Sequence, residues 1–462
     1  MAYNNNRERY EFIERMFVNL STLPIERVIG QYIPLSSRGR HLMGLCPFHK
    51  DTKLGSFIVT PDKHLWKCFT CGDEYAGNSI KFVSLYMGLS YLDASFRVAR
   101  DFGVITAEEY DRYAKKRYDE SYVKSLERRY SDQVKDEPKP VKAPADVIAN
   151  VYQVIKDNCA LSDEHRNSLI KTRHLTKERI ERDYFSCPTN WKLKDNIVLA
   201  IKKKYPAYTD DILKTVPGFF YDKKHNKISF AGYKGLGILI RDANDKIEAI
   251  QIRRDTIKEG DSRYIWLSST FAFYKPEEYE GGCGCGSPKD VLWPETPSKR
   301  LVCITEGRFK SEILAQNGNT TISIQGVTSW SGIDKAIGDI RAKNNAKVVY
   351  IFLDADIFSN HALFVQSTKM CAYIAEKFPD LQIKYAFWHK SVGKGIDDYL
   401  INGGSMKEIN YVDYQKAAIE GESVFNDVLK KYGVSKLQDL PNDKVSTFQT
   451  DLQTLCEKHF LP

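Results

Sequence analysis

From Arg300 onward, apolar strands alternate with amphipathic helices, and this alternation constrains the possible folds more than any other feature of the chain. The strand-like segments are LVCITEG, TISIQG, VVYIFLDAD and IKYAFW, and the helical segments between them are FKSEILAQ, GIDKAIGDIRAKN and ALFVQSTKMCAYIAEKF. Strands joined by helices of this length are parallel, and the helices cover the sheet. The sequence therefore predicts a Rossmann-like parallel sheet over residues 296–402.

Acidic residues stand where these strands end. Glu306 ends the first strand, Asp354 and Asp356 end the third, and Asp397 and Asp398 lie in GKGIDDYL. Ligand sites of parallel sheets form at the carboxyl ends of the strands. Each acid taken alone could simply cap the next helix. Carboxylates gathered at one edge repel each other unless cations lie among them, and hard oxygen ligands suit Mg²⁺ or Mn²⁺. We expect Glu306, Asp354 and Asp356 to hold such an ion.

A second group of residues has the spacing of a zinc site. The pair Cys46-Pro-Phe-His49 is followed by the pair Cys68-Phe-Thr-Cys71. Two such pairs can give four ligands to one tetrahedral Zn²⁺, which makes the site closed and structural. The alternative is a set of ordinary buried cysteines with a surface histidine. The neighbouring aromatic residues are open to two interpretations, because they could stack on DNA bases or form the small core around zinc; they are Phe57, Trp66 and Phe69.

Bulk properties exclude several classes of protein. The net charge of +8 weakly favours a polyanionic partner. No apolar stretch has the length of a membrane-spanning helix, and the N-terminus lacks the apolar region of a signal peptide. We therefore expect a cytoplasmic protein that binds no membrane, with its ten cysteines reduced. No P-loop motif G-x-x-x-x-G-K-[ST] occurs, so a fused helicase is not expected.

Two parts of the chain resemble known families. The segment LCPFHKDTKLGSFIVTPDKHLWKCFTCGDEYAGNSIKFV resembles the Cys-His-Cys-Cys zinc-binding domain of DnaG-type bacterial and phage DNA primases, over about residues 20–105. The order Glu-Gly, Asp-x-Asp and a late acidic turn resembles the Toprim domain of primases, topoisomerases and some nucleases, over about residues 300–402. The third motif departs from the family, because Val392 and Gly395 stand where acids are common. The form TEGRFK…DAD…KGIDDYL is similar to primase-like proteins of plasmids and phages.

This resemblance implies a DNA primase that makes short RNA primers from ribonucleoside triphosphates on a single-stranded DNA template. It implies structural Zn²⁺ and catalytic Mg²⁺ or Mn²⁺, a separate replicative helicase, and a bacterial cell, with a phage or plasmid as the carrier of the gene. The catalytic acids would be Glu306, Asp354, Asp356, Asp397 and Asp398. The cations expected near the nucleotide or template are Arg253, Arg254, Lys310 and Lys394, although these could also be ordinary surface cations. Two other functions remain open: a Toprim-type nuclease, and a non-catalytic adaptor that binds single-stranded DNA.

The same reasoning divides the chain into five segments of a multidomain α+β and α/β protein. A chain of 462 residues is too long for one core, and the stretch DEPKPVKAPAD contains three prolines, which is typical of a linker. The predicted segments are 1–105, a zinc-ribbon-type domain with flanking helices; 106–146, a charged helix and a proline-rich linker; 147–295, a mixed α+β region forming the first part of a polymerase core; 296–402, the Toprim domain; and 403–462, a helical C-terminal region.

Overall fold

The structure is a computed structural model that describes residues 2–38, 41–51, 54–72, 74–114, 116, 118–131, 140–257, 262–273, 275–296, 300–403, 406–435 and 437–461. The chain divides into two compact units. The N-terminal unit comprises Met1–Pro138 and Tyr432–Asn442, and the C-terminal unit comprises Lys139–Lys431 and Asp443–Pro462. Among the described residues, no helix is both long and apolar enough to cross a bilayer.

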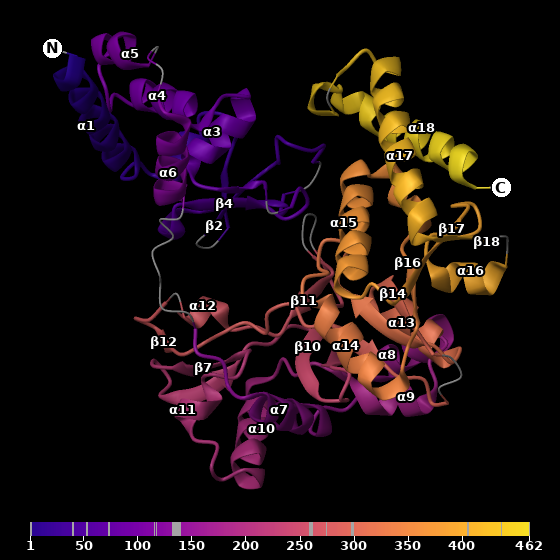
Figure 1. The fold of residues 1–462 in the computed structure, drawn as a ribbon. Coiled ribbons are helices and arrows are strands. Elements are labelled where there is room, and N and C mark those ends of the chain that lie inside the picture. The colour runs from indigo at the N-terminus through magenta and orange to yellow at the C-terminus, as the bar shows by residue number, and fades with distance from the viewer. Residues whose placement is uncertain are drawn as a thin grey trace. The chain divides into compact units, whose positions relative to one another are not determined.

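The N-terminal unit is a small antiparallel sheet covered by helices (Figure 1). Its strands lie in the order β1-β2-β3-β4-β5. The strands are β1 (Ser36–Arg38), β2 (His41–Gly44), β3 (Phe57–Thr60), β4 (Leu65–Cys68) and β5 (Ala76–Gly77). The helices are α1 (Ala2–Leu20), α2 (Ile25–Ile29), α3 (Ser79–Met87), α4 (Tyr91–Asp101), α5 (Ala107–Tyr113) and α6 (Glu120–Ser131). One apolar core joins the sheet to these helices.

The last two helices of this unit correct one expectation. One charged helix was expected at the start of segment 106–146, but the structure has two helices there, α5 and α6. Both contribute buried side chains to the core, Tyr113 from α5 and Leu126 from α6. The charges of this segment lie on the outer faces, so a helix that is half apolar was mistaken for an exposed one. The core of the zinc-binding unit thus includes helices beyond residue 105, and residues 132–139 of the predicted linker lie outside the described residues.

The first part of the C-terminal unit combines helices with two antiparallel sheets, whose fold the sequence did not reveal. The sheets have the orders β11-β10-β9-β6 and β12-β7-β8. The strands are β6 (Tyr184–Ser186), β7 (Phe219–Asp222), β8 (Lys227–Phe230), β9 (Gly235–Arg241), β10 (Ile247–Arg254), β11 (Tyr264–Trp266) and β12 (Tyr279–Glu280). The helices are α7 (Ala145–Asp157), α8 (Asp163–Asn167), α9 (Lys177–Asp183), α10 (Trp191–Lys204), α11 (Asp210–Leu213) and α12 (Thr270–Phe273).

The second part is a six-stranded sheet in the order β13-β15-β14-β16-β17-β18, and its four central strands are parallel as the sequence predicted. Antiparallel strands β13 and β18 close its two edges. The strands are β13 (Asp290–Leu292), β14 (Leu301–Glu306), β15 (Thr320–Ile324), β16 (Val348–Phe352), β17 (Gln382–Trp388) and β18 (Met406–Asn410). The edge strands extend the sheet beyond the segment 296–402 at both ends.

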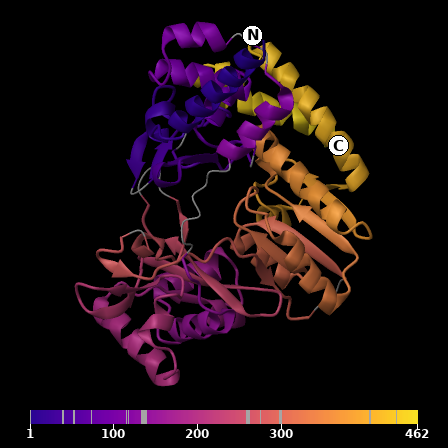
Figure 2. The ribbon, with the colours of Figure 1, turned by 60° about the vertical axis from the view of Figure 1, so that its left-hand side comes forward.

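Helices pack on both faces of this sheet (Figure 2). Trp388 of β17 packs against Tyr399 of α16, whereas Tyr385 of β17 stacks on Tyr414 of α17. Residues an odd number of positions apart in a strand point to opposite faces, so α16 and α17 cover different sides. The helices are α13 (Arg308–Gln316), α14 (Ile333–Asn344), α15 (His361–Lys377), α16 (Ile396–Asn402), α17 (Tyr411–Lys431) and α18 (Val445–Phe460).

A buried ionic network joins the two parts of the C-terminal unit. The guanidinium of Arg308, at the start of α13, donates to Asp290 of β13 at 2.8 Å, to Asp183 of α9 at 2.7 Å and to Glu312 of α13 at 2.7 Å. Arg308 is 3% exposed. Two further cations complete the set, because Arg179 donates to Glu312 and Arg241 donates to Asp183. Three buried carboxylates therefore face three guanidinium groups, and each is hydrogen-bonded.

The pKa values in this network follow from burial and charge. Burial acts to raise the pKa of Asp183, but the charges of Arg308, Arg182 and Arg241 outweigh it and lower that pKa. Burial raises the pKa of Asp290 despite Arg308. Removing one cation would leave buried carboxylates without compensation, which costs far more than losing a surface ion pair.

We expect Arg308→Met to destabilise the C-terminal unit by about 3–5 kcal/mol, because it leaves buried acids unpaired. The measurement is urea-induced unfolding, with hydrogen exchange in β9 and β13 to assign the transition to this unit. The matched control is Lys335→Ala, which breaks the exposed Lys335–Asp339 pair and should cost at most about 1 kcal/mol. A similar small loss for both variants would contradict the structural role of the network.

Candidate functional sites

The four predicted zinc ligands meet in the N-terminal unit. Their ligand atoms all lie within 4.8 Å of one another. The Nδ1 atom of His49 is 3.1 Å from the sulfur of Cys71 and 3.6 Å from that of Cys68, and the sulfur atoms of Cys46 and Cys71 are 3.8 Å apart. Such convergence of three thiols and one imidazole suits tetrahedral Zn²⁺. The arrangement is a Cys₃His zinc site with no position left for a substrate, which makes it structural.

Local hydrogen bonds hold these ligands in place. The backbone amides of Phe48 and Cys71 donate to the sulfur atoms of Cys46 and Cys68, both at 3.4 Å. A carboxylate oxygen of Asp51 accepts from the backbone amide of Cys46 at 3.0 Å and lies 3.9 Å from Nε2 of His49. The Asp51 carboxylate thus faces the ring nitrogen that points away from the sulfurs, which is the usual arrangement for a metal-bound histidine.

The acid–base behaviour of the thiols also indicates a cation. The contact with Cys68 raises the pKa of Cys46 to about 12, and the contact with Cys46 raises the pKa of Cys71 while lowering that of Cys68. Ionisation of any one of these thiols therefore makes ionisation of its neighbours less favourable. Three thiolates can coexist at this spacing only beside a positive charge, and Zn²⁺ supplies it.

The structure separates the three aromatic residues near the zinc site. Phe57 and Trp66 are buried and their rings stack at 5.2 Å, so they belong to the small core. Phe69 is 51% exposed, and the ammonium group of Lys67 lies 5.5 Å from its ring centre. Only Phe69 of the three presents a ring face to solvent.

We expect the protein to bind one zinc ion per chain and Cys68→Ala to lose it, because three remaining ligands bind Zn²⁺ far more weakly than four. The N-terminal unit should then unfold at a lower temperature. Elemental analysis and thermal denaturation measure the two effects. Cys159→Ala is the control, since Cys159 is buried outside the cluster; equal zinc content in both variants would disprove the assignment.

The predicted acids lie at one edge of the six-stranded sheet. Glu306 is the last residue of β14, and Asp354 and Asp356 follow the neighbouring parallel strand β16. Burial is the main cause that raises the pKa of the Glu306 carboxyl, and the negative charge of Asp354 raises it further. Gly307 turns the chain directly after Glu306 with φ of +88°, a conformation that favours glycine. The three acids share one electrostatic environment, as the alternation of strands and helices predicted.

Two lysines lie among these carboxylates. Lys310 of α13 forms an ion pair with Asp354, and Lys394 approaches Asp354 at 3.6 Å and Asp356 at 3.0 Å. Lys394 comes from the GKG loop, whose carbonyl oxygen at residue 394 accepts from the amide of Ala355 at 2.8 Å. The lysines therefore balance the negative charge of the cluster. Unlike the zinc ligands, the acids do not form a group of close metal-ligating atoms among the described residues.

The two acids of the third acidic motif, Asp397 and Asp398, lie in different surroundings. Asp397 lines a cavity together with Glu306 and Lys310. Asp398 accepts backbone hydrogen bonds from Lys394 at 3.0 Å and from Gly395 at 3.2 Å, so its carboxylate closes the start of α16. The structure thus brings Asp397 to the acidic cluster, whereas Asp398 acts within its own loop.

The cavity beside the acids has a volume of about 410 Å³. Its walls contain residues that the sequence did not single out: Arg173, Gln251, Tyr264, Trp266, Phe309 and Gln325. The amide of Gln251 donates to Gln325, while Oε1 of Gln251 and Nε2 of Gln325 have no partner among the described residues. Arg253 and Arg254 were expected near this site, but the lining includes Gln251 from the same strand and neither arginine.

Helix α18 supports the loop that carries two of the acids. Nε2 of Gln453 donates to the carbonyl oxygen of Ala355 at 2.8 Å and to Glu457 at 3.0 Å. Ala355 stands between Asp354 and Asp356, and Gln453 is buried. The C-terminal helices, for which the sequence offered no role, thus fix the loop after β16.

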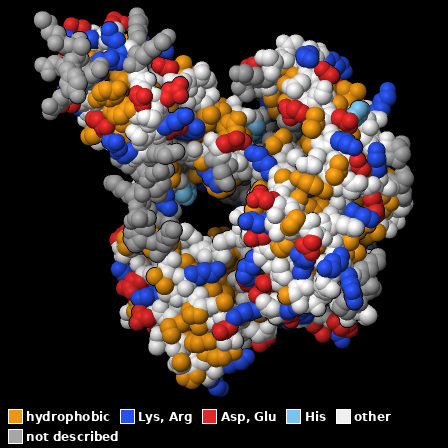
Figure 3. Space-filling view, viewed as in Figure 1, with side chains coloured by type: hydrophobic (Ala, Val, Ile, Leu, Met, Phe, Trp, Pro, Cys, Tyr) orange, Lys and Arg blue, Asp and Glu red, His pale blue; other side chains and the backbone are white. Residues whose placement is uncertain are grey.

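On the face seen in Figure 3, Lys or Arg and Asp or Glu side chains are interspersed over the C-terminal unit.

We expect Gln453→Leu to loosen residues 353–359 without unfolding the unit, because it removes the hydrogen bonds of Gln453 to Ala355 and Glu457 at nearly constant volume. Amide hydrogen exchange in that segment should accelerate by up to about tenfold, which corresponds to roughly 1 kcal/mol for such a bond. The control is Thr454→Ala on the exposed face of the same helix. Unchanged exchange in the Gln453 variant would show that the contact does not hold the loop.

Comparisons with known proteins agree with the zinc site. Residues 11–114 match the family model described as CHC2 zinc finger. Residues 295–407, which contain the acidic cluster, match a model described as a domain of unknown function (DUF3854). The N-terminal unit therefore carries a zinc-finger domain of the CHC2 type, and the match begins before and ends after the ligand pairs.

Parts of the chain are similar to curated DNA primases. The DNA primase of Halalkalibacterium halodurans is 27% identical over 243 residues, which cover 51% of this chain and 36% of the relative. The DNA primase of Aquifex aeolicus is 42% identical over 81 residues, covering 18% of this chain and 16% of the relative. The chain thus aligns with 36% of the length of the first relative and 16% of the second. A crystal structure of the Aquifex aeolicus primase with its zinc-binding and RNA polymerase domains aligns with 97% of both chains at 18% identity and a TM-score of 0.39.

Proposed function

We propose that this protein is a DNA primase that synthesises short RNA primers on single-stranded DNA by metal-dependent nucleotidyl transfer. The observation that carries the proposal is the presence, in one chain, of a CHC2-type zinc finger and a cluster of acids at the carboxyl edge of a parallel sheet. A zinc finger alone fits many nucleic-acid-binding proteins, and an acidic cluster alone fits nucleases as well. Their combination matches the resemblance to DnaG-type primases.

Glu306, Asp354 and Asp356 would hold Mg²⁺ or Mn²⁺ in this proposal, since they offer hard oxygen ligands from two adjacent strands. When bound, the ion would supply positive charge for the attacking 3′-oxygen and the departing pyrophosphate. The raised pKa of Glu306 means that more of this carboxyl is protonated at a given acidic pH than in an exposed glutamate. Metal binding, which needs the ionised form, should therefore strengthen as the pH rises.

Lys310 and Lys394 would bind the triphosphate of the incoming nucleotide. Both ammonium groups already lie beside Asp354, so a small movement of each side chain would bring its charge from a carboxylate to a phosphate oxygen. Asp397, in the same cavity, would help to hold the metal. Asp398, as the cap of α16, would keep the loop of Lys394 in place. Arg253 and Arg254, on β10, would contact the template rather than the nucleotide.

The zinc finger would engage the single-stranded template, and the exposed ring of Phe69 beside Lys67 is suited to stacking on a base. A separate replicative helicase would supply the single strand in a bacterial cell, and the motif pattern TEGRFK…KGIDDYL suggests a phage or plasmid gene. These partners and this origin rest on the resemblance of the sequence motifs.

We expect the zinc-loaded protein to produce short labelled oligomers from ribonucleoside triphosphates on mixed single-stranded templates with Mg²⁺ or Mn²⁺. Asp354→Asn should lower the rate by at least about 100-fold, because it removes charge at the site where the transition state needs it. Template affinity, measured by fluorescence anisotropy, should change little in this variant. The control is Asp339→Asn, on the exposed face of α14, which should retain full activity.

Other outcomes would favour the two alternatives. Metal-dependent degradation of a labelled template without added nucleotides would identify a nuclease that uses the same acids. Template binding without incorporation, unchanged by Asp354→Asn, would identify an adaptor. Primer synthesis that persists in Asp354→Asn would refute the proposed role of the acidic cluster.

A further inference from the structure

The N-terminal unit contains a cavity of about 630 Å³ that the zinc site does not use. It lies between the end of α1, the β3–β4 turn and the start of α3, with Tyr91 of α4 and Tyr130 of α6 completing its wall. The cavity is lined by Phe17, Leu20, Ser21, Thr22, Leu23, Asp62, Lys63, His64, Leu65, Asn78, Ser79, Ile80, Tyr91 and Tyr130. None of the four zinc ligands is among them. This volume is within the range of cavities that bind small organic molecules.

The start of α3 offers hydrogen-bond donors to this cavity. The side chain of Asn78 caps the helix by accepting from the amide of Lys81, and it donates to Tyr91 and to the carbonyl oxygen of Tyr130. The first amides of the helix, those of Ser79 and Ile80, make no hydrogen bond within the described residues. A helix N-terminus with unused amides attracts an anion, because the amide dipoles leave partial positive charge there.

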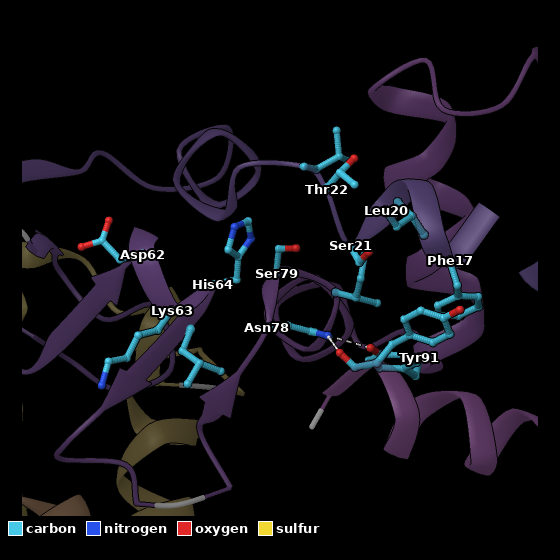
Figure 4. Close-up of a pocket in the computed structure, with 14 residues that line it drawn as sticks. Phe17, Leu20, Ser21, Thr22, Asp62, Lys63, His64, Asn78, Ser79 and Tyr91 are labelled. Atoms are coloured by element: carbon cyan, nitrogen blue, oxygen red, sulfur yellow. Dashed lines mark hydrogen bonds between the residues drawn. The ribbon is translucent and has the colours of Figure 1, made fainter. Parts of the chain in front are cut away.

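The side chain of Ser79 provides a second indication of a ligand. Ser79 is only 7% exposed, and its Oγ has no hydrogen-bond partner among the described residues. Figure 4 draws Ser79 next to His64, with its hydroxyl on the side away from the imidazole ring. The hydroxyl oxygen is not among the fully buried unpaired polar atoms, so it reaches the cavity, where a ligand or water can complete its bonding. The side chain is therefore placed to donate to a bound group.

The β3–β4 turn adds basic side chains on the opposite side. His64 has a left-handed backbone with φ of 49°, and its ring lies next to Ser79 in the view of Figure 4. Such a backbone is uncommon for residues other than glycine and often occurs at binding sites. Lys63 and His64 form no ion pair within the described residues. Asp62 is exposed on the same turn, and its carboxylate points away from Ser79 in Figure 4.

The other end of the cavity is aromatic and apolar. Phe17 stacks on Tyr130 with ring centres 5.0 Å apart and on Tyr91 at 6.1 Å. Leu20 and Leu23 lie on the same side. A ligand that fits the whole cavity thus carries an anionic group at one end and a flat, largely apolar group at the other. Inorganic phosphate would fill only the first part.

We propose that this cavity binds a nucleotide, with its phosphate on the start of α3 and its base against the aromatic end. The phosphate would accept hydrogen bonds from the amides of Ser79 and Ile80, from the Ser79 hydroxyl and from His64. The nucleotide could be free or could be the phosphorylated end of a strand, since both present the same chemistry. This site is separate from the acidic cluster and does not depend on the catalytic activity proposed for it.

The test uses the full zinc-loaded chain without added Mg²⁺ or Mn²⁺, so that nucleotide binding at the acidic cluster is not promoted. Isothermal titration compares adenosine monophosphate with adenosine and inorganic phosphate, and a single-stranded pentanucleotide bearing a 5′-phosphate with the same strand bearing a 5′-hydroxyl. Hydrogen exchange of residues 79–87 reports whether binding occurs at α3. We expect the phosphorylated compounds to bind at least about tenfold more tightly than their unphosphorylated counterparts.

Two variants place the effect at this site. Ser79→Asp puts a carboxylate where the phosphate should lie, and because this side chain is largely buried, circular dichroism and zinc content are compared with the wild type to verify that the variant folds. Its affinity for the phosphorylated probe should fall at least about tenfold, whereas Ser125→Asp, which adds the same charge on the exposed side of α6, should leave it unchanged. His64→Asn removes the imidazole while tolerating the left-handed backbone, and should weaken binding by several-fold.

The outcomes separate the two sources and also the failure of the proposal. Tighter binding of adenosine monophosphate would indicate a free nucleotide, and tighter binding of the 5′-phosphorylated strand would indicate a strand end. Equal binding of adenosine and adenosine monophosphate would overturn the proposal. So would equal affinities of the wild type and Ser79→Asp, or the absence of protection in α3.

Discussion

The guanidinium of Arg308 determines how the two halves of the C-terminal unit meet. It lies two residues after Glu306 and holds acids from α9, β13 and α13 at one point. A charge this deeply buried is stable only when its partners compensate it fully. Moving one partner away would leave a buried charge unpaired. Gly307 and Glu306 directly precede this buried cation. The position of Glu306 is therefore tied to a part of the unit that cannot shift without unpairing buried charges. Asp354 and Asp356 instead lie in the segment after β16, which is held by other contacts such as that of Gln453.

The zinc site and the acidic cluster balance their charge in different ways. At the zinc site, the contacts among Cys46, Cys68 and Cys71 prevent joint ionisation, so only a bound cation makes the ligand set stable. At the acidic cluster, Lys310 and Lys394 already provide positive charge. A metal ion would have to displace these ammonium groups from the carboxylates. When the ion left, the ammonium groups would pair with the carboxylates again. The first arrangement suits a permanent structural ion, and the second suits an ion that enters together with a negatively charged substrate.

The sequence predicted those features that depend on local spacing or on a regular period. The zinc ligands are two short pairs, and the parallel sheet shows as alternating strands and helices, so both could be predicted and both are present in the structure. The placement of Glu306, Asp354 and Asp356 at one edge follows from the same alternation. The helix α6 was misjudged because its charged residues outnumber the few apolar ones, such as Leu126, that it buries.

Other features could not be predicted because they depend on contacts between distant residues. Arg308 reaches Asp183, 125 positions away, and Gln453 reaches Ala355, 98 positions away. No local pattern marks either pair. The facing amides of Gln251, in β10, and Gln325, directly after β15, belong to segments of different sheets. The sequence pattern located the acids but not the residues that hold and surround them.

The altered third acidic motif has a physical explanation in the structure. A side chain at Gly395 would overlap Asp397 and the end of the Lys310 side chain, the latter at 2.7 Å from an added Cβ atom. Glycine at this position therefore makes room for a lysine to reach Asp354. The glycine thus allows Lys310 to form its ion pair with Asp354 beside Asp397.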